Sequence, residues 1–105
     1  MSDLCVVLCT CPDKSSARDI ACKIVEKEQA ACVNIISGMV SVYSWQGRVQ
    51  QSSECQLVIK TTKAAVGKLQ DVVLALHPYD VPEWVVLDIT DSSTDYGNWI
   101  RSTVK

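Results

Sequence analysis

The alternation of apolar and polar residues along the chain predicts seven elements of secondary structure. Strands are expected where β-branched and apolar residues run together or alternate, and helices where apolar residues recur every three or four positions. Gly, Pro, Asp and Ser mark the borders between these segments. In chain order, the pattern predicts a strand at 4–11, a helix from Asp13 to about residue 31, strands at 33–45 and 48–62, a helix at 63–76, a strand at 83–89 and a helix opening at Ser93 or Thr94.

Local signals set several borders of these elements. The run LCVVLCTC at 4–11 is continuously apolar, which is typical of a central strand buried on both faces. Asp13 is a plausible N-cap for the helix that follows, and Pro78 prevents the second helix from continuing. Gly38 predicts a bulge or bend, and Gln46-Gly47 predicts a tight hairpin turn.

The same patterns predict which faces are buried. In the run 48–62, one face carries apolar residues (Val49, Cys55, Leu57 and Ile59) and the other polar ones (Gln50, Ser52, Glu54, Gln56 and Lys60). In the terminal helix, the buried face is expected to hold Tyr96, Trp99 and Ile100.

The order β-α-β-β-α-β-α predicts a single α+β domain spanning residues 1–105. Two right-handed crossovers joined by a hairpin give the split β-α-β arrangement, a ferredoxin-like sandwich with a four-stranded antiparallel sheet and helices on one face.

The hairpin arms, at roughly 12 residues and about 3.3 Å per residue, are twice as long as the other strands. The excess must project and carry Val40, Val42, Tyr43 and Trp45 with it. Because exposed strand edges and aromatic residues tend to be paired, we expect a symmetric homo-oligomer.

Composition narrows the classes of function. The net charge is −2 and the basic residues are scattered singly, which argues against a nucleic-acid partner. No apolar run approaches the roughly 20 residues of a membrane span, and the acidic start does not resemble a signal peptide, so a cytoplasmic location without a membrane partner is expected. The six cysteines include no C-x-x-C pair, which indicates free thiols in a reducing compartment.

Several segments together resemble the divalent-cation tolerance proteins, the CutA family. They are VVLCTCPD (6–13), AACVNII (30–36), VYSWQGRVQQSSECQLVIKTT (42–62), HPYDVPEWVVL (77–87) and DSSTDYGNWI (91–100). The resemblance implies a stable homotrimer of ferredoxin-like protomers, similar to the PII signalling proteins, in which Tyr43 and Trp45 of the hairpin pack against a neighbouring subunit. It also implies a link to tolerance of copper and other divalent metals, with copper binding ascribed to the family.

The resemblance implies that Cys9 and His77 are metal ligands. The histidine pair of the family is Leu76-His77 here, so one of its proposed ligands is absent. Cys11 follows Cys9 by two residues and shares its face of the strand, as does Cys5, so a thiolate pair with His77 is a candidate site for a soft metal. The alternative is that the cysteines are core residues and that His77 ends a helix.

A second candidate site is a polar set in the cleft that the family forms between subunits, made of Glu54, Lys60, Tyr79, Glu83 and Tyr96. Such a cleft predicts a PII-like sensor that binds a small anionic or polar ligand, or a cation held by the acids. The alternative is a salt bridge of Glu54 or Glu83 with Lys60 at a subunit interface.

A third hypothesis is an enzyme, whose candidate residues are His77, Asp80, Glu83 and Cys9. No spacing in the sequence matches a catalytic motif, so we expect a protein without catalysis.

Overall fold

The computed structural model describes residues 3–105 and contains the predicted elements in the predicted order. They are β1 (Leu4–Cys11), α1 (Lys14–Glu26), β2 (Cys32–Trp45), β3 (Arg48–Thr62), a 3₁₀ turn (Lys63–Ala65), α2 (Val66–Leu76), β4 (Val85–Asp88) and α3 (Thr94–Thr103). The strands form one antiparallel sheet in the order β2-β3-β1-β4. This is the ferredoxin-like arrangement that the sequence predicts.

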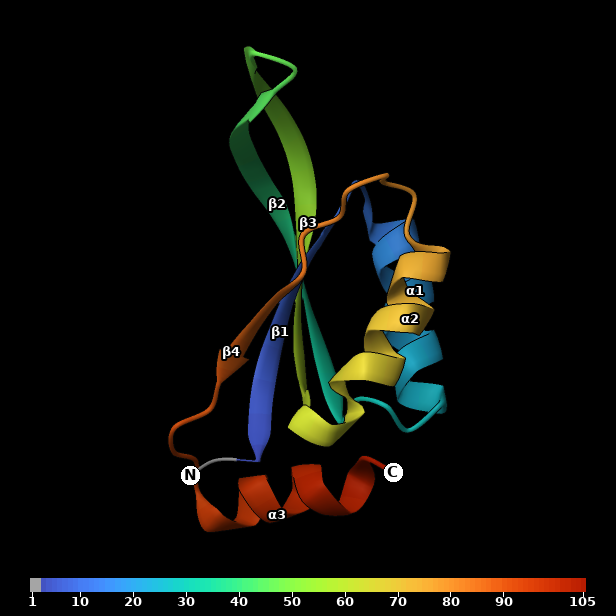
Figure 1. The fold of residues 1–105 in the computed structure, drawn as a ribbon, viewed down its shortest axis with the longest axis vertical. Coiled ribbons are helices and arrows are strands. Elements are labelled where there is room, and N and C mark those ends of the chain that lie inside the picture. The colour runs from blue at the N-terminus through green and yellow to red at the C-terminus, as the bar shows by residue number, and fades with distance from the viewer. Residues whose placement is uncertain (1–2) are drawn as a thin grey trace.

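Two helices cover one face of the sheet, and the third lies across its end. Figure 1 shows α1 and α2 side by side against the sheet, while α3 crosses below the start of β1. The main core lies between the sheet and α1 and α2, and Val7, Ile20, Leu57 and Leu69 are fully buried in it. A smaller core joins α3 to β1 through Ile100 and Leu4. The prediction of helices on one face therefore holds for α1 and α2 and is wrong for α3.

Local signals mark the start of α1 and the ends of α1 and α2. The Asp13 carboxylate accepts a hydrogen bond from the Ser16 backbone N–H at 2.8 Å, as expected of an N-cap. Helix α1 ends at Glu26, and Glu28 takes a positive φ of 58°, so the chain reverses well before Ala31. Ala31 is buried but lies beyond the helix, which corrects the longer helix that its spacing predicts. Helix α2 ends at Leu76, one residue before the His77-Pro78 pair.

The hairpin of β2 and β3 projects beyond the body of the molecule. These strands have 14 and 15 residues, against 8 in β1 and 4 in β4, and their tip stands clear of both helices (Figure 1). Gln46 and Gly47, with φ of 52° and 76°, form the turn, and the ladder shifts register between Ile36 and Met39 around Gly38. Both predictions for this hairpin are confirmed. Val49 lies beyond the core and is 78% exposed, so the apolar face of β3 is buried only in its second half.

Two predictions near the C-terminal end need correction. The fourth strand covers Val85–Asp88, shorter than the predicted 83–89. The buried residues of α3 are Gly97 and Ile100, whereas Tyr96 and Trp99 are 41% and 43% exposed in this chain. Because α3 crosses the end of the sheet rather than lying on its face, it buries a narrower stripe than its apolar spacing suggests. Within residues 3–105, no helix is both long and apolar enough to cross a membrane.

Candidate metal centre

The alternation of strand β1 places three of its cysteines on the face that α1 and α2 cover. Cys5, Cys9 and Cys11 all have no exposed surface, as expected for alternate residues of a central strand on the core side. Cys9 and Cys11 belong to the main core cluster, near the end of the strand that leads into α1. His77 approaches the same place from the C-terminal end of α2 and is also buried.

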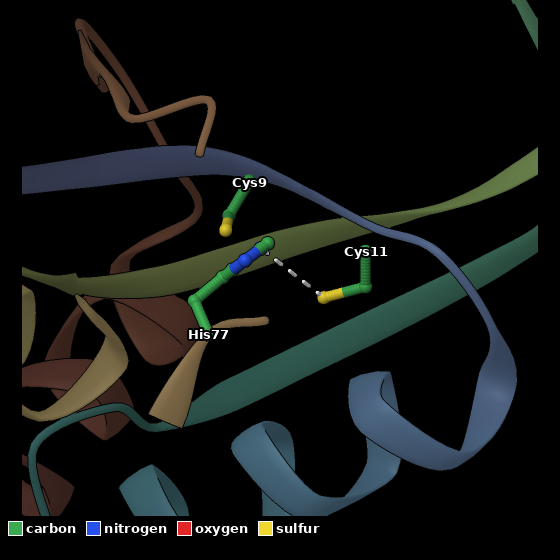
Figure 2. Close-up of side chains that lie close together, drawn as sticks. All are labelled: Cys9, Cys11 and His77. Carbon is green, nitrogen blue, oxygen red and sulfur yellow. Dashed lines mark hydrogen bonds between the residues drawn. The ribbon is translucent and has the colours of Figure 1, made fainter. Parts of the chain in front are cut away.

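Cys9, Cys11 and His77 converge in space, as Figure 2 shows. One ligand atom from each residue lies within 4.8 Å of the other two, and the Cys11 Sγ is 3.8 Å from the His77 Nε2. Ligands on a tetrahedral metal ion with bonds of about 2.0–2.3 Å stand roughly 3.3–3.8 Å apart. A shift of about 1 Å or less would therefore bring the three donors onto one ion.

His77 has hydrogen-bond partners of its own. Its Nδ1 accepts a bond from the Tyr79 backbone N–H at 3.1 Å, so Nε2 carries the ring proton and donates it to the Thr10 carbonyl oxygen at 2.7 Å. The ring thus joins the end of α2 to β1, which agrees with the structural role considered for a histidine at a helix end. A metal ion at Nε2 requires the ring proton to move to Nδ1, which breaks the bonds with both Thr10 and Tyr79, so the two thiols are the more available donors.

The two thiols also affect each other. The closeness of the two thiols raises the pKa of Cys9 and lowers the pKa of Cys11. Burial raises the pKa of Cys9 further and opposes the lowering at Cys11.

On the opposite face of the sheet, part of the predicted polar set lines a hollow of about 740 Å³ between the hairpin and the segment 78–83. The Tyr79 hydroxyl donates to the Glu54 carboxylate at 2.5 Å, and the Thr10 hydroxyl donates to the Glu83 carboxylate at 2.7 Å. Burial raises the pKa of Tyr79, and the hydrogen bond to Glu54 raises it further. The other lining residues are Ser41, Tyr43, Trp45, Ser52, Pro78, Asp80, Val81 and Pro82.

The hollow is acidic. Glu54, Asp80 and Glu83 line it, and none of the described residues in its lining is basic. Aromatic rings and carboxylates around one space favour a cationic guest. Of the two kinds of ligand predicted for this site, this lining favours the cation, because the ammonium group that an anion would need belongs to Lys60, outside the hollow.

Lys60 and Tyr96 lie away from this hollow. Lys60 stands opposite Cys32 in the ladder, and its ammonium group donates to the Asn34 side-chain oxygen. Although Glu54 and Lys60 share a face of β3, six residues of strand separate them by about 20 Å. Among residues 3–105 the ion pairs are Lys63–Asp88 and Arg101–Asp3, and the bridge to Lys60 expected at a subunit interface stays a prediction. Tyr96 packs against Trp99 on α3, with ring centroids 5.5 Å apart.

Sequence reasoning missed the roles of Thr10 and Gln56. They face each other across β1 and β3, and the Gln56 amide donates to Glu83 at 3.2 Å and to the Cys9 carbonyl at 3.1 Å. The alternation of β1 already indicated that Thr10 points away from the cysteines. The partner of Thr10 was not indicated, because Glu83 lies 73 residues further along the chain.

The sheet order, the long hairpin and the buried thiol–imidazole cluster together define a ferredoxin-like α+β protein with a candidate centre for a soft metal. Residues 5–103 match the model of the CutA1 divalent ion tolerance protein family. The chain belongs to this family, which confirms the resemblance drawn from its motifs.

Known members of the family align over nearly the whole chain. The divalent-cation tolerance protein CutA of Thermus thermophilus is 49% identical over 96 residues, which cover 91% of this chain and 93% of the relative. The crystal structure of CutA from Xylella fastidiosa superposes with a TM-score of 0.96 at 36% identity, covering 99% of this chain and all of the other. The periplasmic divalent cation tolerance protein CutA of Archaeoglobus fulgidus gives a TM-score of 0.94 at 29% identity, covering 97% of this chain and 99% of the other.

Proposed function

We propose that this divalent-cation tolerance protein binds copper, as Cu(I), through the thiolates of Cys9 and Cys11, with His77 as a third ligand. The observation that carries the proposal is the buried cluster in which the three donors lie within 4.8 Å of one another. Thiolate and imidazole are the ligands that Cu(I) favours. Two thiolates around one monovalent ion leave a single negative charge in the core, and the neutral imidazole adds none.

In this proposal the protein sequesters its metal and catalyses no reaction. Cys9, the nucleophile of the enzyme hypothesis, is fully buried and its thiol has a raised pKa, which disfavours attack on a substrate. All six cysteines are free, which suits the reducing cytoplasm in which we place the protein. The relative from Archaeoglobus fulgidus, in contrast, is described as periplasmic.

Titration with Cu(I) under anaerobic conditions, against a chromophoric chelator, tests the proposal. Cys9→Ser and Cys11→Ser should each weaken Cu(I) binding by at least about tenfold, because each removes a ligand. His77→Ala should weaken it less, because the ring must first give up its bond to Thr10. In wild type, Cu(I) at about 100 times its Kd should also stabilise the fold by about 2.7 kcal/mol in thermal unfolding.

Cys5→Ser is the matched control. Cys5 is buried in the same strand and on the same face, but it lies outside the cluster. Equal Cu(I) affinity in all four variants would contradict the proposal.

A second candidate function is that of a PII-like sensor whose hollow binds a small ligand. The specific observation in its favour is the acidic and aromatic lining around Glu54 and Tyr79. This lining suits an organic ammonium ion, with the aromatic faces of Tyr43 and Trp45 beside the carboxylates.

We also propose that the protein is a homotrimer. The projecting hairpin and its exposed apolar residues support this, since such a surface on a soluble protein usually meets a partner. Tyr43 and Trp45 are half-exposed on this hairpin and are the proposed contacts with the neighbouring subunit.

A further inference from the structure

A fourth potential metal ligand, Cys55, lies beside the cluster of Cys9, Cys11 and His77. In the ladder between β1 and β3, Cys55 stands directly opposite Cys11. Both are buried in the same core cluster, so both side chains are on the helix-covered face of the sheet. Directly opposed residues of an antiparallel pair have Cβ atoms about 4.5–5.5 Å apart. The sulfur of Cys55 is therefore a neighbour of the site, although it is not among the three donors that already lie within 4.8 Å of one another.

We propose that a divalent ion of the zinc group, Zn²⁺ or Cd²⁺, recruits Cys55 and is bound by Cys9, Cys11, Cys55 and His77. This inference rests on the proposed function, because it assumes that the first three residues bind metal. It goes further by adding a fourth ligand and by assigning that ligand to one class of ion.

The number of ligands distinguishes zinc-group ions from Cu(I). Zinc in a structural site takes four ligands in a closed tetrahedron, and three thiolates with one imidazole form a common set. Cys9, Cys11 and His77 alone would leave one position open in a core where all three side chains are buried. Cu(I) does not require that fourth ligand.

The net charge of the occupied site also distinguishes a zinc-group ion from Cu(I). A divalent ion with three thiolates and a neutral imidazole leaves one negative charge in the core. Cu(I) with three thiolates would leave two, and a buried charge is costly. Cys55 should therefore not be a ligand when Cu(I) is bound. When a zinc-group ion binds, three thiols release three protons to solvent and three sulfur–metal bonds form.

To form this site, the side chain of Cys55 has to rotate, whereas those of Cys9, Cys11 and His77 move little. The edges of a tetrahedral site with sulfur ligands are about 3.8 Å, the same as the separation of the Cys11 Sγ and the His77 Nε2. Cys55 reaches the site by rotation about its Cα–Cβ bond, because the ladder already fixes its Cα opposite that of Cys11. The ring proton of His77 moves from Nε2 to Nδ1, so the bonds to the Thr10 carbonyl and from the Tyr79 N–H are both given up for the metal bond at Nε2.

Cadmium titration of the reduced chain tests this assignment, because the thiolate-to-cadmium absorption per bound ion counts the sulfur ligands. Cys55→Ser should lower this absorption by about one third, from three thiolates to two, and should weaken Cd²⁺ binding by at least about tenfold. Its Cu(I) affinity should stay within about twofold of wild type, because Cu(I) does not need the third thiolate. Cys55→Val keeps the apolar character of this core position and is the second variant, and Cys5→Ser is the control.

The outcomes separate this inference from the proposed function. If wild type shows the absorption of two thiolates and Cys55→Ser matches it, Cys55 is not a ligand, while the Cu(I) site stands. If wild type and Cys5→Ser show three thiolates and both Cys55 variants show two, the four-ligand site is supported. If wild type binds neither Cd²⁺ nor Cu(I), both proposals fall. Thermal unfolding of each metal-free variant checks that the fold is intact.

Discussion

At the scale of single residues, His77 shows how one side chain serves the fold and a candidate site together. Its ring accepts a bond from the backbone after α2 and donates one to β1, so it is satisfied without a metal ion. A buried polar group with its hydrogen bonds made contributes to the core instead of weakening it. The cost of breaking these bonds opposes metal binding at His77, so in the proposed site the affinity depends first on the two thiols.

Glu54 and Tyr79 offer a residue-scale test of the hollow as a ligand site. Glu54 is 9% exposed and accepts a bond from Tyr79, so this carboxylate is held in place facing the aromatic rings. Benzyltrimethylammonium should quench the fluorescence of Trp45, and Glu54→Gln should weaken its binding by about 1 kcal/mol, or roughly fivefold, because the attracting charge is lost.

The control for this test is Lys60→Met. Lys60 lies outside the hollow, so the affinity of this variant should equal that of wild type. Unchanged binding in Glu54→Gln, or an absence of saturable quenching in wild type, would count against the sensor hypothesis.

At the scale of elements, the hairpin depends on a turn with two positive φ angles. Gln46 and Gly47 supply them in the two-residue turn between β2 and β3. A turn of this hand matches the right-handed twist of the strands on either side, and such turns prefer Asn-Gly. Gln46 is thus less favourable at this position than Asn. The hairpin still forms because β2 and β3 pair over a long ladder.

The same substitution should have opposite effects in this turn and in α2. Gly47→Ala should lower the free energy of unfolding by about 1 kcal/mol, because a Cβ is strained at a φ of 76° even though the space around it is open. Gly67→Ala lies in helix α2 with open space around its Cα, and it should raise that free energy by about 0.5–1 kcal/mol. Denaturant unfolding of both variants checks the contrast, and a shift of the same sign in both would contradict it.

At the scale of the whole molecule, the shape is set by one long hairpin on a small sandwich. The longest dimension is 44 Å, against 25 and 23 Å for the other two. The hairpin accounts for this elongation (Figure 1), and the apolar residues near its tip are exposed in this chain. The shape therefore favours assembly in which hairpins meet other subunits.

Sedimentation equilibrium at micromolar protein should give the mass of three 11.5-kDa chains. Val40→Lys with Val42→Lys places two charges on exposed apolar positions of the hairpin and should shift the protein toward the monomer. Val25→Lys, at an exposed position on α1, is the control and should leave the mass unchanged. A monomeric wild type would refute the trimer.

Much of the fold could be predicted because its signals are local. The apolar run of β1, the Asp13 cap, the Gln46-Gly47 turn and Pro78 each act on neighbouring residues, so each border was placed within a few positions. The errors at Ala31, at Val49 and on α3 occur where tertiary packing decides which part of a periodic pattern is buried, and the fourth strand is shorter than its apolar run predicts.

The candidate ligands of the site could be named before the structure was known, but their arrangement in space could not. The shared face of Cys9 and Cys11 on β1 follows from the sequence alone, because residues two apart in a strand always point the same way. That His77 meets them and that Cys55 stands opposite Cys11 depend on strand register and helix packing, which the tertiary structure sets. Alternation fixes the direction in which a side chain points, whereas strand register and helix packing fix which distant residue it meets.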